Sequence, residues 1–338
     1  MKKVILIAEA GPNHNGKIQL AYKLIDLAKK CGADFIKFQT SIPEMHISKF
    51  AQKAKYQIKN TKKGGGQLEM SKKISLTYGE FKKIKRYCKS KKIEFLSTPF
   101  DLKSIDFLKS LKMKYFKIPS GEITNLPYLN KVGKLKKKVI LSTGMANMKE
   151  IGKALKVLTL NGTNKKNITV MQCNTEYPTP IKDVNLRAML TIKKKFKVNI
   201  GYSDHTLGVE ASIMAVTYGS KIIEKHFTLD KGYSNFRDHK LSADPDEMSK
   251  LVKSVRRSSV MVGLYTKTIS KNEKKNLNSM RRSLYAKVQI DKGKKITLKK
   301  IKLVRPYNSI SPKKINKILN KKAKSLIKKS QAINFKSV

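Results

Sequence analysis

Short runs of β-branched and aromatic residues alternate along the chain with amphipathic stretches of helical length. The first run is Val4–Ala8; a turn cluster with Gly11 and Gly16 follows it, and Ile18–Cys31 then places apolar residues at intervals of three and four. Such intervals predict a helix with one buried face. The chain is therefore expected to begin with a strand, a loop and a helix.

Seven further runs of this kind follow, and helical stretches separate most of them. The predicted strands after the first are Phe35–Phe38, Phe95–Leu96, Tyr115–Ile118, Val139–Leu141, Ile168–Gln172, Val198–Gly201 and Ile222–Ile223. The further predicted helices are Tyr78–Ser90, Ser104–Leu111, Met148–Thr159, Leu186–Lys195, Val209–Tyr218 and Pro245–Val262. Because strands joined by helical crossovers run parallel, these units predict an α/β fold that closes as a (β/α)8 TIM barrel.

The segment Thr40–Ser75 departs from this rhythm. It is long, rich in lysine and glutamine, and contains Gly64–Gly66. A loop of this length within a compact domain usually has a function. We therefore expect it to lie over the mouth of the barrel.

The pattern changes again near Gly263, so that residues 1–263 form the predicted barrel domain. Residues 264–280 are polar and rich in lysine, which is typical of a linker. Residues 281–338 contain the apolar run Leu284–Ile290 and a helix-like stretch from Pro312 to Lys329. They predict a small second domain.

Composition narrows the class of protein. Of the 338 residues 40% are hydrophobic, which excludes a basic disordered tail, and no apolar run approaches the length of a membrane span. The initial apolar run meets Glu9 too soon to resemble a signal peptide. Cys31, Cys88 and Cys173 are isolated, as is usual in a reducing compartment. We expect a cytoplasmic protein with no membrane partner.

The charge suggests a nucleic-acid binder at first sight. Lysine and arginine number 75 against 23 aspartates and glutamates, a formal net charge of +52. However, few of these cations are arginine, the residue that favours phosphate contacts, and the lysines are spread over nearly every segment. We therefore assign the excess charge to solvated faces and expect no nucleic-acid partner.

Polar residues end every predicted strand, where TIM-barrel enzymes build their active sites. The polar ends are Glu9, Lys37–Thr40, Ser97–Phe100, Lys117–Glu122, Ser142–Gly144, Gln172–Tyr177, Ser203–Thr206 and Glu224–Thr228. Any one of them alone could simply cap the following helix. Together they are expected to converge on one mouth.

Two kinds of chemistry are present at these ends. His205 and His226 follow neighbouring strands and could share a divalent metal ion, although a lone buried histidine is more often a satisfied core residue. Lys37 and Lys117 face inward, which is costly unless they are paired. With Ser120, Ser142 and Ser203 they could hold a phosphate or carboxylate, and a Schiff-base lysine is the competing explanation.

These residues stand within longer runs that resemble the sialic acid (nonulosonic acid) synthase family, of the N-acetylneuraminate and N,N'-diacetyllegionaminate synthase type. The runs are Ile7–Gly11, Asn13–Gly16, Gly32–Asp34, Lys37–Thr40, Leu96–Phe100, Phe116–Glu122, Leu141–Met145, Tyr177–Pro180, Gly201–Thr206 and Glu224–Thr228. The tail, notably Ser283–Gly293 and Val304–Pro306, resembles the antifreeze-like SAF domain of the same family.

The resemblance implies a transferase that condenses phosphoenolpyruvate with an open-chain 2-acetamido sugar to give a nine-carbon acid and phosphate. The sugar would be N-acetylmannosamine or 2,4-diacetamido-6-deoxymannose. It also implies a Mn²⁺ or Mg²⁺ cofactor held by His205 and His226, and a homodimer in which the SAF domain of one subunit reaches over the barrel of the other.

Roles for the remaining site residues follow from the same resemblance. Phosphoenolpyruvate would be held by Lys37, Thr98, Lys117, Ser120, Ser142, Asn174 and Ser203. The sugar would contact Gln39, Phe100, Tyr177, Asp238 and, from the SAF domain, Arg305. Glu9 and Glu122 would handle protons and sugar hydroxyls.

Within the family, Ala54–Gln57 and Ile118–Leu129 are more similar to legionaminic acid synthases than to neuraminate synthases. The loop Tyr233–Pro245 keeps Asp238 but approaches it over more residues than the family commonly uses. Another barrel carboligase, either a different phosphoenolpyruvate-dependent sugar-acid synthase or a Schiff-base aldolase, is the alternative function.

Overall fold

The computed structural model of the protein describes residues 3–52, 66–233 and 237–338. Ala54–Gln57 and residues 234–236 of the loop after the eighth strand lie outside the described residues. The chain divides into two compact units, Met1–Gly263 and Leu264–Val338, each described by itself below.

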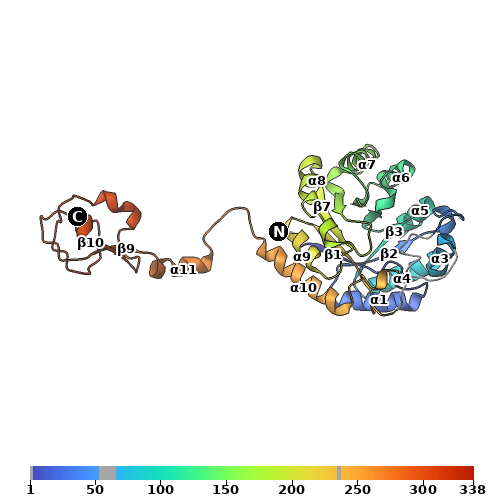
Figure 1. Cartoon of the computed structure of the whole chain (residues 1–338), viewed down its shortest axis with the longest axis horizontal. Helices are drawn as coiled ribbons and strands as arrows, with labels where there is room; N and C mark the ends of the chain where they lie inside the picture. The colour runs from blue at the N-terminus through green and yellow to red at the C-terminus, as the bar shows by residue number, and fades with distance from the viewer. Residues whose placement is uncertain (1–2, 53–65, 234–236) are drawn as a thin grey trace. The chain divides into compact units, whose positions relative to one another are not determined.

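Unit 1 is a barrel of parallel strands surrounded by helices (Figure 1). Its strands are β1 Ile5–Glu9, β2 Phe35–Thr40, β3 Glu94–Pro99, β4 Tyr115–Ile118, β5 Lys138–Ser142, β6 Ile168–Gln172, β7 Asn199–Asp204 and β8 Ile222–His226. Their order is β3-β2-β1-β8-β7-β6-β5-β4, so the first strand pairs with both the second and the eighth. Since β3 and β4 also pack side by side, the sheet curves into a nearly closed barrel. The TIM-barrel prediction is confirmed.

The helices of unit 1 are α1 Ile18–Lys30, α3 Gln67–Ile74, α4 Tyr78–Ser90, α5 Leu102–Ser110, α6 Leu126–Lys134, α7 Met148–Leu160, α8 Ala188–Phe196, α9 Glu210–Thr217 and α10 Pro245–Met261. In α4, α5, α6, α7 and α10 the residue before the helix caps it with a side-chain hydrogen bond. Thr77 with Glu80 and Asn147 with Glu150 form capping boxes for α4 and α7, respectively. The short 3-10 helices are η1 Pro43–Met45, η2 Ser120–Glu122, η3 Lys165–Asn167, η4 Ile181–Asp183 and η5 Arg237–His239.

Two of these helices were not expected from the sequence. Helix α3 lies in the segment predicted as an extended loop, and α6 follows β4. In α6 the last turn contains Gly133, where an added Cβ would lie 2.6 Å from Cβ of Asn161. The close approach of α6 to the end of α7 requires that glycine, and it also weakens the amphipathic pattern by which a helix is recognised.

The base of the barrel is fastened by Asp34, just before β2. Its carboxylate accepts hydrogen bonds from Lys3 Nζ at 2.5 Å, from the Leu6 backbone N–H at 2.9 Å and from Arg256 Nη2 at 2.6 Å. Arg256 also donates to the carbonyl of Val4. These bonds join the start of the chain to helix α10, which carries Arg256.

Unit 2 is small and has its own hydrophobic core. It contains α11 Lys271–Met280, the antiparallel strands β9 Ser283–Ala286 and β10 Ile301–Val304, and the 3-10 helices η6 Leu298–Lys300 and η7 Pro312–Lys317. Its core is formed by apolar side chains that include Leu284, Ile290, Ile296, Ile318, Ile327 and Ile333.

Two expectations about this part of the chain need revision. The segment predicted as a linker contains a helix, because Ser270 and Glu273 form a capping box at the start of α11. The prediction of a helix-like stretch from Pro312 to Lys329 was wrong beyond Lys317. Asn320 adopts a left-handed φ of 64°, and Ile327 pairs with Ile290 as an isolated bridge, so this stretch folds back onto the core.

Among the described residues, no helix has both the length and the apolar character needed to cross a membrane.

Candidate active site

A cavity of about 200 Å³ opens at the carboxyl ends of the barrel strands. Residues from all eight strand ends line it, as expected when parallel strands finish at one edge. The predicted site residues that line it are Glu9, Lys37, Gln39, Thr98, Phe100, Lys117, Ser120, Ser142, Tyr177, Ser203, His205 and His226. We call this cavity the main cavity.

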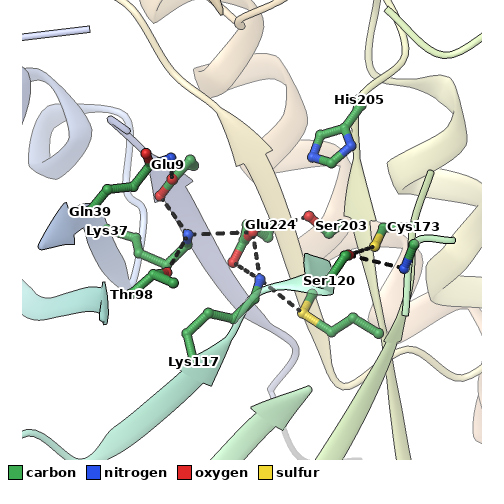
Figure 2. Close-up of polar contacts among 12 residues, drawn as sticks. Glu9, Lys37, Gln39, Thr98, Lys117, Ser120, Cys173, Ser203, His205 and Glu224 are labelled. Atoms are coloured by element: carbon green, nitrogen blue, oxygen red, sulfur yellow. Dashed lines mark hydrogen bonds and ion pairs between the residues drawn. The ribbon is translucent and has the colours of Figure 1, made fainter. Parts of the chain in front are cut away.

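Two lysines and two glutamates form an ion-pair network in the main cavity (Figure 2). Lys37 Nζ lies 2.9 Å from Glu9 Oε2 and 3.6 Å from Glu224 Oε1. Lys117 Nζ lies 2.7 Å from both carboxylate oxygens of Glu224. Each of the four side chains is at most 5% exposed, so their charges are screened by one another rather than by water.

Burial and pairing set the protonation of these groups. Burial raises the pKa of Glu224, but the charges of Lys117 and Lys37 outweigh it and lower the pKa to about 2. Burial also raises the pKa of Glu9, which Lys37 opposes and Glu224 reinforces, so that it reaches about 7. A carboxyl group with such a pKa can exchange a proton near neutral pH.

Burial and pairing also shift the pKa values of the two lysines in opposite directions. Burial lowers the pKa of Lys37, but Glu224 and Glu9 together outweigh that effect, and the pKa is raised. Burial lowers the pKa of Lys117, and Glu224 alone does not compensate for burial and for the nearby charge of Lys37. Lys37 is therefore the more firmly charged of the two.

Glu224 had no role in the sequence analysis, although the sequence held a signal for it. Side chains alternate across a strand, so residues two apart on β8 share a face. If His226 faces the mouth, then Glu224 must also face it. The structure places both in the main cavity.

Hydroxyl groups and a tightly packed glycine also line the main cavity. Ser203 Oγ donates to Glu224 Oε1 at 3.0 Å, and Ser120 Oγ accepts from the Gly144 N–H at 3.0 Å. An added Cβ on Gly144 would lie 2.6 Å from Thr175 Cγ2, so any larger residue there would force the side chain of Thr175 to shift. Other lining residues that the sequence analysis did not assign include Gly121, Met145, Cys173 and Thr175.

His205 and His226 lie together on one side of the main cavity, with ring centroids 5.3 Å apart. The ring of Tyr177 packs 4.3 Å from that of His205. Burial lowers the pKa of both histidines to about 3; the neighbouring His226 adds to the effect on His205, and Lys37 adds to the effect on His226. Both imidazoles are therefore neutral at physiological pH.

Two neutral imidazoles are chemically suited to contribute to a divalent metal site. His205 Nδ1 donates to the backbone carbonyl of Asn174 at 2.5 Å, which leaves the lone pair on Nε2. His226 Nδ1 is buried without a hydrogen bond among the described residues, 3.5 Å from Asp238 Oδ2. No group of three or more His, Cys, Asp or Glu side chains in the described ranges could hold a metal ion. The two imidazoles would thus leave most coordination positions open to water or substrate.

The other predicted site residues lie outside the lining of the main cavity. The carboxylate of Glu122 accepts from Asn125 Nδ2 at 2.6 Å. The amide of Asn174 donates to the carbonyl of Asp183 at 2.8 Å, while its own carbonyl orients His205. Asp238 is buried beside His226, and Arg305 belongs to unit 2.

Known proteins resemble this chain over nearly all of its length. Residues 24–267 match the NeuB family, and residues 281–338 match the SAF domain. The chain is 49% identical over 333 residues to an N,N'-diacetyllegionaminic acid synthase of Campylobacter jejuni, covering 98% of this chain and 99% of that protein. A synthase of the same name from Legionella pneumophila is 41% identical, covering 93% of this chain and 88% of that protein.

A solved structure agrees with the sequence comparisons. The N-acetylneuraminic acid (sialic acid) synthetase of Leptospira borgpetersenii superposes with a TM-score of 0.73 and 32% sequence identity. The match covers 81% of this chain and 90% of that chain.

Proposed function

The chain belongs to the NeuB family, and from that membership we propose that it is a phosphoenolpyruvate-dependent synthase of N,N'-diacetyllegionaminic acid. The family resemblance seen in the sequence is confirmed. Two relatives that share 49% and 41% of their residues with the chain carry this activity in their names. The observation that carries the proposal is the main cavity itself, where paired buried lysines face two neutral imidazoles.

In the proposed reaction, C3 of phosphoenolpyruvate attacks the aldehyde carbon of open-chain 2,4-diacetamido-6-deoxymannose, and a carbon–carbon bond forms. Water then adds at C2 of the former phosphoenolpyruvate, and the bond from C2 to the phosphate oxygen breaks. The products are the nine-carbon acid and inorganic phosphate. Every atom of the two substrates and one water is thereby accounted for.

The anionic substrate would bind at the lysines. Lys37 and Lys117 supply charge, and the hydroxyls of Thr98, Ser120, Ser142 and Ser203 supply hydrogen bonds. Asn174, whose carbonyl accepts from His205, is the further group proposed for phosphoenolpyruvate. Because Glu224 already contacts both lysines, the phosphate and carboxylate would share them with it. Glu9, with its raised pKa, is placed to hold or release a proton, and Glu122 is the second carboxylate for the sugar hydroxyls.

His205 and His226 would hold a divalent ion, Mn²⁺ or Mg²⁺, which would supply Lewis acidity at the sugar carbonyl. Burial keeps both imidazole rings neutral, so that each has a lone pair for a metal ion. The hydrogen bond to the Asn174 carbonyl fixes the tautomer of His205. Asp238 holds a carboxylate beside His226, where it can orient that ring.

The sugar would extend from this point along Gln39, Phe100, Tyr177 and Asp238. We further propose a domain-swapped homodimer in which Arg305 of one copy donates to the acetamido group bound by the other, and a cytoplasmic location. These three assignments rest on the family resemblance alone.

Phosphate release tests the proposed function. The full-length protein would be incubated with phosphoenolpyruvate, Mn²⁺ and either 2,4-diacetamido-6-deoxymannose or N-acetylmannosamine. We expect phosphate release with the diacetamido sugar at a kcat/KM at least about tenfold higher than with N-acetylmannosamine. A chelator or the His205→Ala substitution should abolish this release. Release that survives chelation would contradict the metal assignment. Covalent trapping by borohydride would favour a Schiff-base aldolase instead.

A further inference from the structure

A second cavity of about 230 Å³ lies beside the main cavity. The two cavities share Gln39 and Phe100 in their walls, so they are neighbours at the barrel mouth. The rest of the second cavity has no role in the reaction described above. We call it the side pocket. Its lining residues apart from the shared pair are Gly11, Pro12, His14, Ser41, His46, Ile47, Gln67, Ser71, Ile74 and Ser75.

Helix α3 forms one wall of the side pocket and lies close to the turn after β1. Its first residue, Gln67, donates its backbone N–H to the Ala51 carbonyl at 3.1 Å. At its other end, an added Cβ on Gly16 would lie 2.6 Å from the Lys73 carbonyl oxygen, which shows how closely the turn after β1 meets this helix. The side pocket is therefore built from the barrel and from the segment that folds back over it.

Two histidines in the side pocket have tautomers fixed by backbone partners. His14 Nδ1 accepts from the Gly16 N–H at 3.1 Å, so the neutral ring carries its proton on Nε2. Burial lowers the pKa of His14 to about 4, which keeps the ring neutral. His46 Nδ1 lies 3.2 Å from the Ile42 carbonyl, which can only accept, so Nδ1 is the donor in that bond and Nε2 is the ring position that can accept from a ligand. One ring thus has a free donor position and the other a free acceptor position.

The remaining walls are apolar or neutral. Pro12, Ile47 and Ile74 supply apolar surface, and the ring of Phe100 lies 5.7 Å from that of His46, centroid to centroid. Among the described lining residues there is no Lys, Arg, Asp or Glu, in a chain with 75 cationic side chains. A phosphorylated group would find no counter-charge in this lining.

A secondary amide bearing a methyl group matches this combination. Its N–H needs an acceptor, its carbonyl needs a donor, and its methyl group needs an apolar wall. We propose that the side pocket binds the acetamido group at C4 of the diacetamido sugar and so selects that sugar over those with a hydroxyl there. This inference rests on the proposed function and names the part of the site that determines its substrate.

The direction of the sugar chain agrees with this placement. The aldehyde carbon must lie in the main cavity, next to the lysines and the two imidazoles. The chain then leaves past Gln39 and Phe100, the residues common to both cavities. Gln39 is itself oriented by donating Nε2 to Glu9 Oε1 at 3.1 Å. Substituents several bonds from the aldehyde therefore meet the side pocket.

The test compares two sugars in variants of the side pocket. His46→Leu removes the proposed acceptor, and Ser71→Leu fills space from the partly exposed helix α3. The readout is kcat/KM for 2,4-diacetamido-6-deoxymannose divided by that for N-acetylmannosamine. We expect this ratio to fall about tenfold or more in each variant, because an amide N–H loses its partner or its space. His46→Gln, which restores an acceptor, should recover part of the ratio.

Lys73→Leu is the matched control, because Lys73 lies on the same helix but is exposed and absent from the side-pocket lining. Its ratio should equal that of the wild type. If His46→Leu fails to fold, as judged by circular dichroism and melting, Ser71→Leu decides the question.

The outcomes separate the inference from the proposed function. A wild type that prefers the diacetamido sugar, with an unchanged ratio in folded His46→Leu and Ser71→Leu, overturns the inference alone. A wild type that prefers N-acetylmannosamine overturns both the inference and the proposed substrate. N-Acetylmannosamine 6-phosphate is included in the panel, and a preference for it would contradict a neutral group in the side pocket.

Discussion

Lys37 and Lys117 differ in how many carboxylates each contacts. Lys37 lies between Glu9 and Glu224, whereas the only carboxylate ion-paired with Lys117 among the described residues is Glu224. The pKa of Lys37 is consequently raised, because the two carboxylates outweigh its burial. Both lysines nonetheless line the space in which an anion would sit.

We therefore predict that Lys37→Met and Lys117→Met each raise the KM for phosphoenolpyruvate by about ten- to a hundredfold, the value of a charge-assisted hydrogen bond. The KM for the sugar should change far less. Steady-state kinetics with each substrate varied in turn would measure both constants. Lys134→Met, at an exposed position, is the control and should change neither. Equal increases for both substrates would contradict the assignment of the lysines to the anion.

At the residue scale, the sequence predicted which residues line the main cavity better than it predicted the contacts that they make. The polar strand ends identified Lys37, Lys117 and the two histidines, because their positions follow from the barrel topology. The contacts of Glu122 and Asn174 depend on how the loops after β4 and β6 turn, and no periodicity encodes that. The side-chain bond from Glu122 to Asn125, three residues further on, forms in such a turn.

At the scale of elements, the ends of β7 and β8 are joined by a further buried ion pair, separate from the network in the main cavity. Lys225 Nζ lies 3.2 Å from Asp204 Oδ2 and 2.6 Å from the Thr206 carbonyl. Asp204 also accepts from Ser212 Oγ of helix α9 at 2.7 Å. Since Ser203 and Glu224 face the main cavity, their neighbours Asp204 and Lys225 face the helices. The ion pair between Asp204 and Lys225 therefore holds together the two strand ends that carry His205 and His226.

We predict that Lys225→Met weakens Mn²⁺ binding by about ten- to a hundredfold, as is common when groups that orient metal ligands are lost. The KM for phosphoenolpyruvate should change much less, a separation that general unfolding would not produce. Metal titration by calorimetry would measure the effect, with Lys221→Met at an exposed position as control.

Because Lys225→Met leaves Asp204 as an uncompensated buried charge, it can also lower stability. The double variant Asp204→Asn/Lys225→Met removes that charge and should regain stability without regaining metal affinity. Wild-type affinity in a folded single variant would show that the pair does not position the histidines.

Helices and strands were predictable where a buried face requires a regular spacing of apolar residues, and less so elsewhere. All eight strands and most helices of unit 1 follow the apolar pattern, because each has one face or both faces in the barrel core. In unit 2, Ile318 and Ile327 contact a small irregular core instead of a regular helix face, so their lysine-rich surroundings suggested a helix that does not form.

At the scale of the whole molecule, Asp34 couples the folding of unit 1 to pH. Burial raises its pKa, but hydrogen bonds from Lys3, Arg256 and the Leu6 backbone outweigh this and lower it below its usual value. The folded state therefore favours the ionised form. The stability gained is fully present above the unfolded pKa of about 3.9 and is lost as pH falls through the folded value.

Asp34→Asn should accordingly lower the Tm of the protein by about 2–4 °C at pH 7. The difference from the wild type should shrink as the pH is lowered from 4 to 2. Thermal melts monitored by circular dichroism across this range would show it. The control is Asp106→Asn, because Asp106 pairs with Lys131 at an exposed site where an ion pair contributes little. A difference that stays constant down to pH 2 would contradict the role of the carboxylate.

The proposed dimer makes a prediction that joins two copies of the chain. If Arg305 of one copy completes the sugar site of the other, Arg305→Ala and His226→Ala should each be inactive alone. When the two variants are mixed and allowed to exchange subunits, a mixed dimer has one site with both residues intact. Random pairing gives intact residues at about a quarter of all sites, so about a quarter of wild-type turnover should return.

A mixture of tagged and untagged chains would show whether subunits exchange. If exchange is demonstrated and no activity returns, Arg305 acts within its own chain or has no part in the reaction. Deletion of residues 280–338 should leave a barrel that still binds phosphoenolpyruvate and the metal.

The thermal stability of the barrel is affected by the buried network of Glu9, Lys37, Lys117 and Glu224. A barrel interior is ordinarily filled by layers of branched apolar side chains. Four ionisable side chains replace part of that filling here, and a buried ion pair often stabilises the fold by less than the desolvation of its charges costs. The protein thus carries a trade-off at its centre, since a catalytically dead barrel with apolar residues at these positions would be expected to melt at a higher temperature.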